Sequence, residues 1–313
     1  MKTWSTLSAF LAEYGSAAMV SVLAVKGSVP REAGARMVVA PNGSFKGTIG
    51  GGTLEWDCLK TAQKMLSDKT DGYELQKFAL GPSLGQCCGG SVEVLIEAFD
   101  IEQVHDVALL SKAEEKGVFS TATSLTDGRV KRTISGEASA DRVTDIGDGQ
   151  YLEAFGDQLS QLYLYGAGHV AKALMLSLAP LPFRVSWFDQ RADMFPAHVP
   201  SNFRCLAEEK PEASLAAAPS GAMVLIMTHS HDLDFALCNE ALTQDRFSYV
   251  GVIGSETKGK RFRSRLKKLG CLEDLIARLR CPIGFEGIAG KDPASIAVSV
   301  TTELLMKRES LNV

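Results

Sequence analysis

A short stretch near the middle of the chain has the residue types and spacing of a phosphate-binding turn. Gly166, Gly168 and Ala171 stand in the order Gly-x-Gly-x-x-Ala, directly after an apolar run at 162–165 and before residues that recur at helical spacing. In such a unit the first glycine permits the tight turn and the second lets the backbone approach a pyrophosphate. The small third residue lets helix and strand pack closely. The pattern predicts a dinucleotide-binding turn.

An acidic residue lies where a ribose-binding carboxylate is expected. A second apolar run, at 183–188, ends in Asp189, about 20 residues beyond the glycines, the distance typical of the acid that binds a ribose hydroxyl. Gln190 and Arg191 follow directly and would suit either a 2′-phosphate or a structural role. The alternative is a plain strand–helix–strand unit whose glycine turn binds no ligand.

Two adjacent cysteines, Cys87 and Cys88, form a second candidate site. They follow Gln86 and lie among glycines, in a loop predicted between strands at 73–80 and 91–99. Structural cysteines are usually buried singly in apolar segments, whereas a glycine-framed pair can be exposed and approach a ligand. Thiolates bind soft metals and act as nucleophiles or sulfur carriers. Too few other ligands lie nearby for a zinc site, and a vicinal disulfide or an incidental pair are the alternatives.

A glycine loop before a helical pattern is the third candidate. Gly50, Gly51 and Gly52 lie directly before that pattern, and successive backbone N–H groups at a helix start form an anion-binding site. Arg31, in a preceding Pro-Arg loop, could supply a counter-charge. The alternative is a tight bend in which Thr53 caps the helix.

Polar residues also follow the other predicted strands of the C-terminal half. His169 lies in the glycine turn, His229 and His231 follow a buried run, and Ser255 precedes a basic helix. Because the carboxyl ends of parallel strands share one edge, we expect these side chains in one crevice. The histidines are expected to contact an anion or to order the loop rather than to bind a metal. The basic helix is a solvated face, or its first turn contacts phosphate.

The order of these elements predicts an α/β protein of two domains. An N-terminal mixed α+β domain is expected over 1–135, and a linker with a closing strand over 136–157. From 158 to 313 strands alternate with helices, which predicts a Rossmann-like, doubly wound parallel sheet.

Composition and charge exclude several classes of protein. The 45% hydrophobic and 22% charged residues are typical of a globular protein, and the net charge of −4 indicates no nucleic-acid partner. No apolar run reaches the roughly 20 residues of a membrane span, and the first residues form an amphipathic helix rather than a signal peptide. The seven cysteines include no CxxC pair and no disulfide framework. We therefore expect a cytoplasmic protein with no membrane partner.

Several stretches, taken together, resemble the XdhC/CoxI family, the accessory proteins that mature xanthine dehydrogenase and related molybdenum hydroxylases. The resemblance covers most of the chain. The stretches are GSVPREAGARMVV and GTIGGGTLE within 27–55, GQCCGG at 85–90, YGAGHVAKAL at 165–174, THSHDLD at 228–234, VIGSETKGKR at 252–261 and CPIGFEGIAGKDPASIA at 281–297.

The resemblance implies a chaperone that binds molybdenum cofactor (molybdopterin) and protects it from oxidation. It would hold the cofactor while a cysteine desulfurase installs the sulfido ligand, and then insert it into apo-xanthine dehydrogenase. Such a protein has no turnover of its own, forms a homodimer and meets the proteins of molybdenum cofactor biosynthesis.

The implied sites fall on the candidates above. Cys87 and Cys88, with Gln86, would lie near molybdenum, and the glycine loop with Arg31 near the pterin or its phosphate. Part of the cofactor, or a nucleotide such as NAD(P), would occupy a crevice formed by Gly166, Gly168, His169, Asp189, His229, His231 and Ser255. The alternatives are an NAD(P)-dependent oxidoreductase that uses the Rossmann domain, a protein-interaction module, and a sulfurtransferase with one of these cysteines as persulfide carrier.

Overall fold

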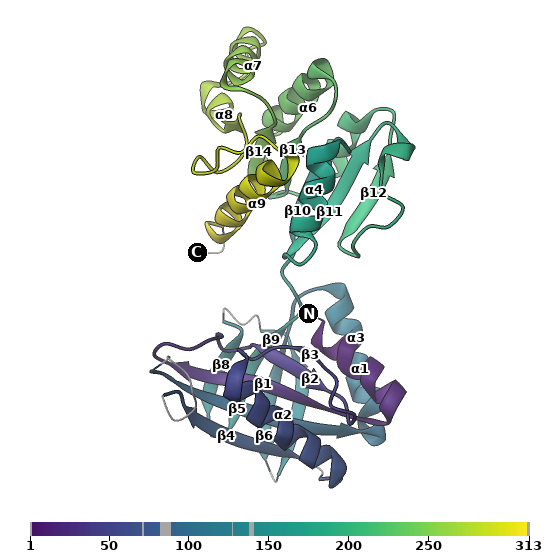
Figure 1. Ribbon diagram of the computed structural model, residues 1–313, viewed down its shortest axis with the longest axis vertical. Coiled ribbons are helices and arrows are strands. Elements are labelled where there is room, and N and C mark those ends of the chain that lie inside the picture. The colour runs from purple at the N-terminus through teal and green to yellow at the C-terminus, as the bar shows by residue number, and fades with distance from the viewer. Residues whose placement is uncertain (1, 71, 82–88, 127, 138–140, 312–313) are drawn as a thin grey trace. The chain divides into compact units, whose positions relative to one another are not determined.

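The chain folds into two units, residues 1–158 and 159–313, in the computed structural model (Figure 1). The structure describes residues 2–70, 72–81, 89–126, 128–137 and 141–311. Within these ranges, no helix combines the length and the apolar character that crossing a membrane requires.

The N-terminal unit contains two antiparallel sheets. The five-stranded sheet has the order β3-β2-β1-β5-β4 and the four-stranded sheet the order β7-β6-β9-β8. Their strands are β1 (Ser16–Lys26), β2 (Arg36–Val39), β3 (Phe45–Gly47), β4 (Tyr73–Ala79), β5 (Ser91–Asp100), β6 (Phe119–Thr126), β7 (Arg129–Ser135), β8 (Val143–Gly147) and β9 (Gln150–Phe155). The helices are α1 (Thr3–Tyr14), α2 (Gly52–Ser67) and α3 (Val104–Lys116).

The five-stranded sheet is covered on both faces, because side chains alternate along each strand. Val20 and Val22 of β1 belong to the apolar core that includes Leu54 of α2. Met19 points to the other face and joins the core that includes Leu7 of α1. The long apolar run of β1 therefore forms a strand buried on two sides.

A cluster of buried charges lies between the two sheets. Glu153 of β9 accepts hydrogen bonds from Arg36 of β2 (3.1 Å), Arg132 of β7 (3.1 Å) and the Thr123 hydroxyl of β6 (2.6 Å). Arg132 also contacts Glu97 of β5. The four charged side chains are each at most 4% exposed. Two guanidinium groups and two carboxyl groups are thus paired in the interior, and burial raises the pKa of Glu97 to about 7.

Glu153 is the centre of this cluster. Burial alone would raise the pKa of Glu153, but attraction to Arg132 and Arg36 and the hydrogen bonds to its carboxylate outweigh burial and lower the pKa to about 2. The carboxylate therefore stays ionised between the sheets at neutral pH and compensates both guanidinium groups.

The C-terminal unit is built on a parallel sheet of six strands in the order β12-β11-β10-β13-β14-β15. The strands are β10 (Ser160–Tyr165), β11 (Phe183–Asp189), β12 (Phe203–Ala207), β13 (Met223–Ile226), β14 (Tyr249–Val252) and β15 (Leu279–Arg280). The helices are α4 (His169–Leu178), α5 (Ser214–Ala217), α6 (His231–Thr243), α7 (Glu256–Lys268), α8 (Glu273–Ala277) and α9 (Pro293–Glu309). The strand order reverses between β10 and β13, the place where doubly wound sheets bind ligands.

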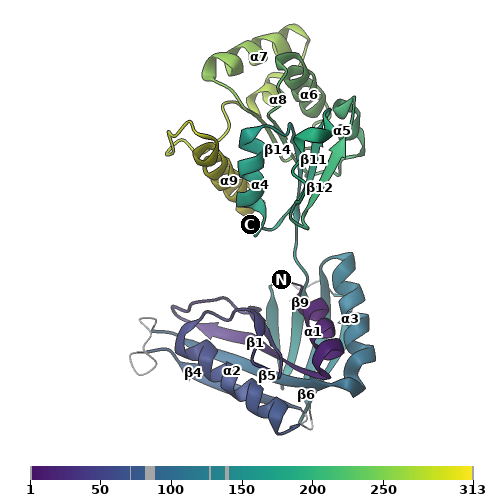
Figure 2. The same cartoon turned by 45° about the vertical axis from the view of Figure 1, so that its right-hand side comes forward.

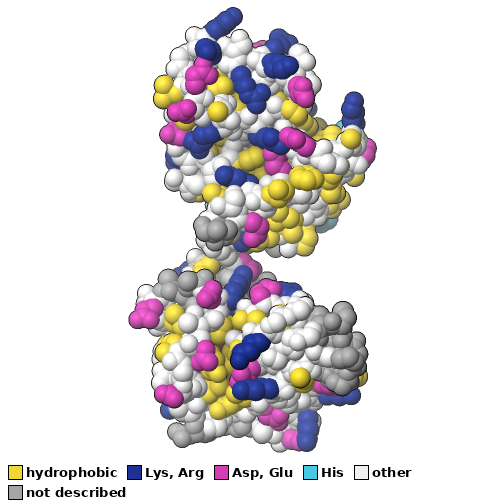
Figure 3. All heavy atoms as spheres, turned by 90° about the vertical axis from the view of Figure 1, so that its left-hand side faces the viewer, with side chains coloured by type: hydrophobic (Ala, Val, Ile, Leu, Met, Phe, Trp, Pro, Cys, Tyr) yellow, Lys and Arg dark blue, Asp and Glu magenta, His cyan; other side chains and the backbone are white. Residues whose placement is uncertain are grey.

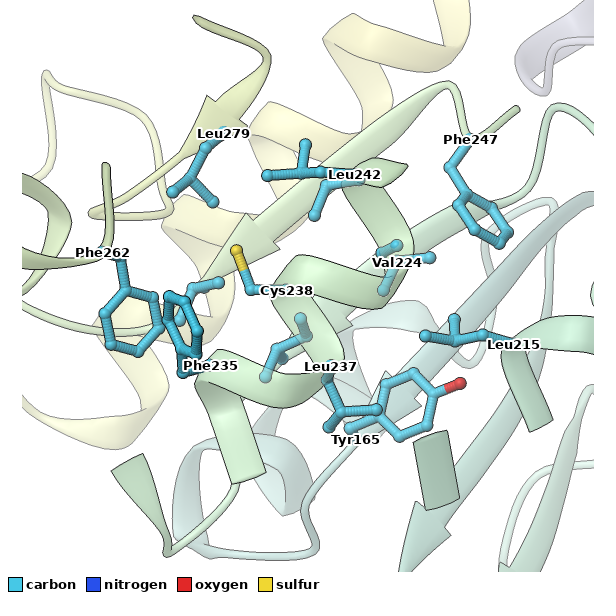
Figure 4. Packing of buried hydrophobic residues seen from close by; sticks show 14 of the residues in the cluster. Tyr165, Leu215, Val224, Phe235, Leu237, Cys238, Leu242, Phe247, Phe262 and Leu279 are labelled. Atoms are coloured by element: carbon cyan, nitrogen blue, oxygen red, sulfur yellow. The ribbon is translucent and has the colours of Figure 1, made fainter. Parts of the chain in front are cut away.

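Helices cover both faces of this sheet (Figure 2). On one face Met223 and Leu225 join the core that includes α4 and α9. On the other face Val224 packs in a core with residues of α5, α6, α7 and α8, including Phe235 and Phe262 (Figure 4). Burial on both sides explains why β13 is apolar without interruption. The predicted Rossmann-like fold after an N-terminal mixed domain is thus confirmed.

The stretch 136–157 ends in a strand, as predicted, but it does not form a linker. It contributes β8 and β9 to the four-stranded sheet, and it belongs to the N-terminal unit, which ends at Gln158. The prediction of a linker there was wrong because four of the five residues of β8 are exposed. An exposed strand buries few side chains, so its sequence shows no apolar alternation. It is a strand because it pairs with a neighbouring strand.

We predict that Glu153→Gln destabilises the N-terminal unit by about 3–5 kcal/mol, because Arg36 loses its buried counter-charge and Arg132 keeps only Glu97. The measurement is guanidinium chloride unfolding followed by circular dichroism. The control is Lys77→Gln, since Lys77 is 75% exposed in its ion pair with Glu93, and this change should stay within about 0.5 kcal/mol. Equal small changes in both variants would contradict the prediction.

Candidate functional site

The predicted glycine turn lies where β10 meets the loop after β13. Gly166 has φ 103°, and a Cβ on it would stand 2.2 Å from the carbonyl oxygen of Met227. Its N–H donates to the carbonyl of Phe188 (2.7 Å), and its own carbonyl accepts from the indole of Trp187 (2.8 Å). Glycine is therefore required here by the packing of the chain itself.

The second glycine of the turn has no such reason to be glycine. Gly168 precedes α4 with φ −76°, a conformation that any residue adopts. A Cβ there would meet no atom within 4 Å. Open space beside a helix start is what the close approach of a ligand to the backbone needs.

Asp189 is fully engaged within the protein. Its carboxylate accepts four hydrogen bonds, from the Ala167 N–H (2.7 Å), the Arg191 N–H (3.0 Å) and two guanidinium nitrogens of Arg191 (3.0 and 3.2 Å). Burial tends to raise its pKa, but these donors outweigh burial and hold the pKa below its ordinary value. In this arrangement Asp189 fixes the glycine turn, and Arg191, 41% exposed, is its ion-pair partner.

A second buried carboxylate, Asp234, organises the loop after β13. Its Oδ1 accepts from the N–H (3.0 Å) and the hydroxyl (2.7 Å) of Thr228, and its Oδ2 accepts from Lys258 Nζ (2.6 Å). Lys258 also donates to the carbonyl of Ile253 (2.8 Å). The ion pair therefore joins the loops that follow two neighbouring strands.

The predicted crevice residues divide between two hollows of the sheet edge. Gly166, Asp189 and His229 line one small pocket, together with Tyr165 and Phe188, whose rings stack 4.9 Å apart. By contrast, a separate cleft beside α7 is lined by His231 and Ser255. Gly168 and His169 lie at the start of α4 and line neither hollow.

Three histidines of the sheet edge, His169, His229 and His231, are exposed. Among the residues that the structure describes, no three or more His, Cys, Asp or Glu side chains gather where they could hold a metal ion. Ser255 caps α7, because its hydroxyl oxygen accepts from the N–H of Lys258 (3.3 Å).

The glycine loop of the N-terminal unit surrounds a carboxylate of its own helix. Glu55 Oε2 accepts from the Ile49 N–H (3.0 Å), the Gly51 N–H (3.3 Å) and the Thr48 hydroxyl (2.5 Å). Helix α2 begins at Gly52 after Gly51, and no side chain caps it, so Thr53 does not have the capping role that the alternative assigned to it. The loop can hold an anionic oxygen, and here the protein supplies that oxygen.

The Pro30–Arg31 loop and Gly90 lie at the same end of the five-stranded sheet. The Pro30 ring stands 2.6 Å from where a Cβ on Gly50 would lie, which places the Pro30–Arg31 loop against the glycine loop. Arg31 is 41% exposed. Gly90 packs against the backbone of Lys26 and Ser28. The segment with Gln86, Cys87 and Cys88, which precedes Gly90, lies outside the described residues.

Two acidic residues that hold these loops from neighbouring helices, Glu55 and Asp234, were not among the predicted site residues. The sequence contains a signal for Asp234, because it falls on the buried stripe of α6 with Leu237, Cys238 and Ala241. A buried acid on such a stripe must have a partner. Glu55 lies four residues beyond Gly51, so its carboxylate can reach back to the loop before its helix.

We predict that the two glycines of the turn respond differently to alanine. Gly166→Ala should cost at least about 2 kcal/mol, because the added Cβ overlaps a carbonyl oxygen at positive φ. Gly168→Ala should cost less than about 1 kcal/mol, since only a slightly poorer helix start is introduced. Chemical unfolding of both variants tests the difference. Equal losses of stability in the two variants would show that the chain around Met227 can move to make room for a Cβ at residue 166.

Comparisons with known proteins agree with this architecture. The model of the XdhC Rossmann domain matches residues 162–304, and the model of the XdhC and CoxI family matches residues 10–78. A crystal structure described as a xanthine dehydrogenase from Bacillus halodurans has a TM-score of 0.80, with 20% identity, over 99% of this chain and 96% of that one. At this identity the likeness shows a shared fold.

Two relatives extend over nearly the whole chain. Uncharacterized protein YqeB of Escherichia coli (strain K12) is 26% identical over 298 residues, which are 94% of this chain and 44% of YqeB. The chain therefore spans less than half of that relative. A protein of Bacillus subtilis (strain 168) named as a probable subunit of xanthine dehydrogenase is 25% identical over 341 residues, 98% of each chain. With one family model matched in each unit, the chain belongs to the XdhC and CoxI family.

Proposed function

We propose that this protein is an accessory chaperone that binds molybdenum cofactor, holds it for sulfuration and inserts it into apo-xanthine dehydrogenase. The observation that carries the proposal is the family match in both units, over residues 10–78 and 162–304. The Bacillus subtilis relative, which aligns over 98% of both chains, is named for xanthine dehydrogenase. Both facts favour a role in the maturation of that enzyme.

The glycine loop of the N-terminal unit fits the phosphate of such a cofactor. The N–H groups of Ile49 and Gly51 already hold one oxygen of the Glu55 carboxylate, which stands in for a ligand anion. Arg31 is partly exposed beside this loop, 3.6 Å from the exposed Glu32, and could turn its positive charge to a phosphate. A phosphate would take these donors after Glu55 turns away.

Cys87 and Cys88 are the proposed contacts to the metal, with Gln86 beside them. Molybdopterin supplies a soft, dithiolene-bound metal and a phosphate, and soft metals favour thiolate ligands. The loop with these cysteines ends at Gly90, which packs on the loop between Lys26 and Ser28. Gly90 and the glycine loop therefore lie at the same end of the sheet.

The rival function, an NAD(P)-dependent oxidoreductase, depends on the Rossmann turn. The strand order and the open space at Gly168 favour a nucleotide there. However, Asp189 would have to exchange its bonds to Arg191 for a ribose hydroxyl. We therefore propose nucleotide or pterin binding at the turn without hydride transfer.

The partners follow from this role and are part of the proposal. They are apo-xanthine dehydrogenase as the client, a cysteine desulfurase as the sulfur donor, and the proteins of molybdenum cofactor biosynthesis as the source. A homodimer is proposed as the working form.

The test is co-purification of the cofactor from a host that makes molybdopterin. We expect near-stoichiometric molybdenum and oxidised pterin with the wild-type protein, and a loss of at least about 80% of the molybdenum in Cys87→Ala or Cys88→Ala, because a thiolate ligand is removed. Metal analysis and pterin fluorescence give the two readings.

The matched control is Cys271→Ala, which removes a partly buried thiol of the C-terminal unit and should leave both readings unchanged. If the wild-type protein contains neither molybdenum nor pterin and contains NAD(P) instead, the chaperone proposal fails and the oxidoreductase takes its place.

A further inference from the structure

A cleft of about 670 Å³ lies beside α7 in the C-terminal unit. It runs along the helix from Thr257 to Lys268 and is closed on one side by the first residues of α6. Figures 1 and 2 show α6 and α7 next to each other, and Figure 3 shows several Lys and Arg side chains at this end of the unit. The volume of the cleft is within the range of about 300–1,000 Å³ that small-molecule sites have.

Most basic residues of α7 are already paired with other groups of the protein. Lys258 binds the buried Asp234, Arg265 lies 3.5 Å from Asp232, and Lys267 pairs with Glu273. Arg263 donates to the carbonyl of Leu279 (2.8 Å). Each of these contacts gives its residue a structural role.

Three other cations of the helix remain without a counter-charge. Lys260, Arg261 and Lys268 line the cleft, and among the residues that the structure describes none of them has an ion-pair partner. Arg261 and Lys268 are seven residues apart, on one face of the helix and about 10 Å from each other. Within the described lining Asp232 is the one acid, and it is shared with Arg265.

We propose that this cleft binds a phosphorylated small molecule of nucleotide size that carries at least two negative charges. Lys and Arg recognise phosphate by charge-assisted hydrogen bonds. The buried Phe262 and the aliphatic parts of the basic side chains form an apolar wall against which an organic moiety packs. His231 and Ser255, which the sequence predicted in the cofactor crevice, line this cleft, whereas Gly166 and Asp189 do not. The proposal rests on the cations of α7 and not on the proposed cofactor contacts.

An acidic protein surface fits the cleft less well. Protein interfaces are poor in Lys at their centre, whereas here two of the three unpaired cations are Lys. The cations also line a concave space rather than a flat surface. The chemistry and the shape therefore favour a small ligand.

The test uses adenosine diphosphate as probe, with the full-length protein in calorimetry at low ionic strength. We expect binding by the wild-type protein and affinity about tenfold lower in the double variant Arg261→Gln/Lys268→Gln, since two charge contacts are lost. Lys267→Gln removes one positive charge from the same helix, outside the cleft lining, and should change the affinity by less than about twofold.

Two further readings decide the outcome. The double variant should retain the molybdenum and pterin content of the wild-type protein, which separates this site from the proposed function. The proposal is overturned if the wild-type protein does not bind the probe, if the double variant binds it unchanged, if Lys267→Gln weakens binding equally, or if a polyglutamate peptide binds the cleft as tightly.

Discussion

Among the described residues, an internal carboxylate holds each of three loops that follow strands or precede a helix at the candidate sites. Asp189 accepts the N–H of Ala167 in the glycine turn, Asp234 accepts the N–H of Thr228, and Glu55 accepts the N–H groups of the N-terminal glycine loop. Buried or partly buried N–H groups must be paired, and a nearby acid supplies the strongest acceptor. This requirement fixes the loops, and the loops fix the shape of both candidate sites.

The same carboxylates also restrict what a ligand can do. The donors of an anion site are present at residues 49–51, but Glu55 uses them, so an anion gains only the difference between its own bonds and those it replaces. At the glycine turn Asp189 accepts the N–H of Ala167, while the space beside Gly168 stays open. A ligand beside Gly168 would contact the backbone of the turn without displacing a side chain of the protein. The two loops thus differ in the cost of binding, although their sequences resemble each other.

The sequence predicted the strands, turns and helices that depend on neighbouring residues along the chain. The apolar run before Gly166 and the helical spacing after it give a strand, a turn and a helix, and the structure has β10, the turn and α4 in these places. The polar β8 could not be recognised, since only its pairing with β9 defines it. Likewise, the spacing of Asp189 indicated a ribose ligand, but spacing does not show that Arg191 turns back onto the carboxylate. Long-range partners decide which polar residues are free, and they are not visible in a local pattern.

The pairing of buried acids also determines where free positive charge remains. Lys258 neutralises Asp234, and Arg36 and Arg132 neutralise Glu153 and Glu97, so these cations contribute little field at the surface. The unpaired cations of α7 are different, because no acid of the described lining other than Asp232 opposes them. A chain with a net charge of −4 can therefore attract an anion at one place. The local charge of a cleft, rather than the net charge of the chain, decides which ligand it attracts.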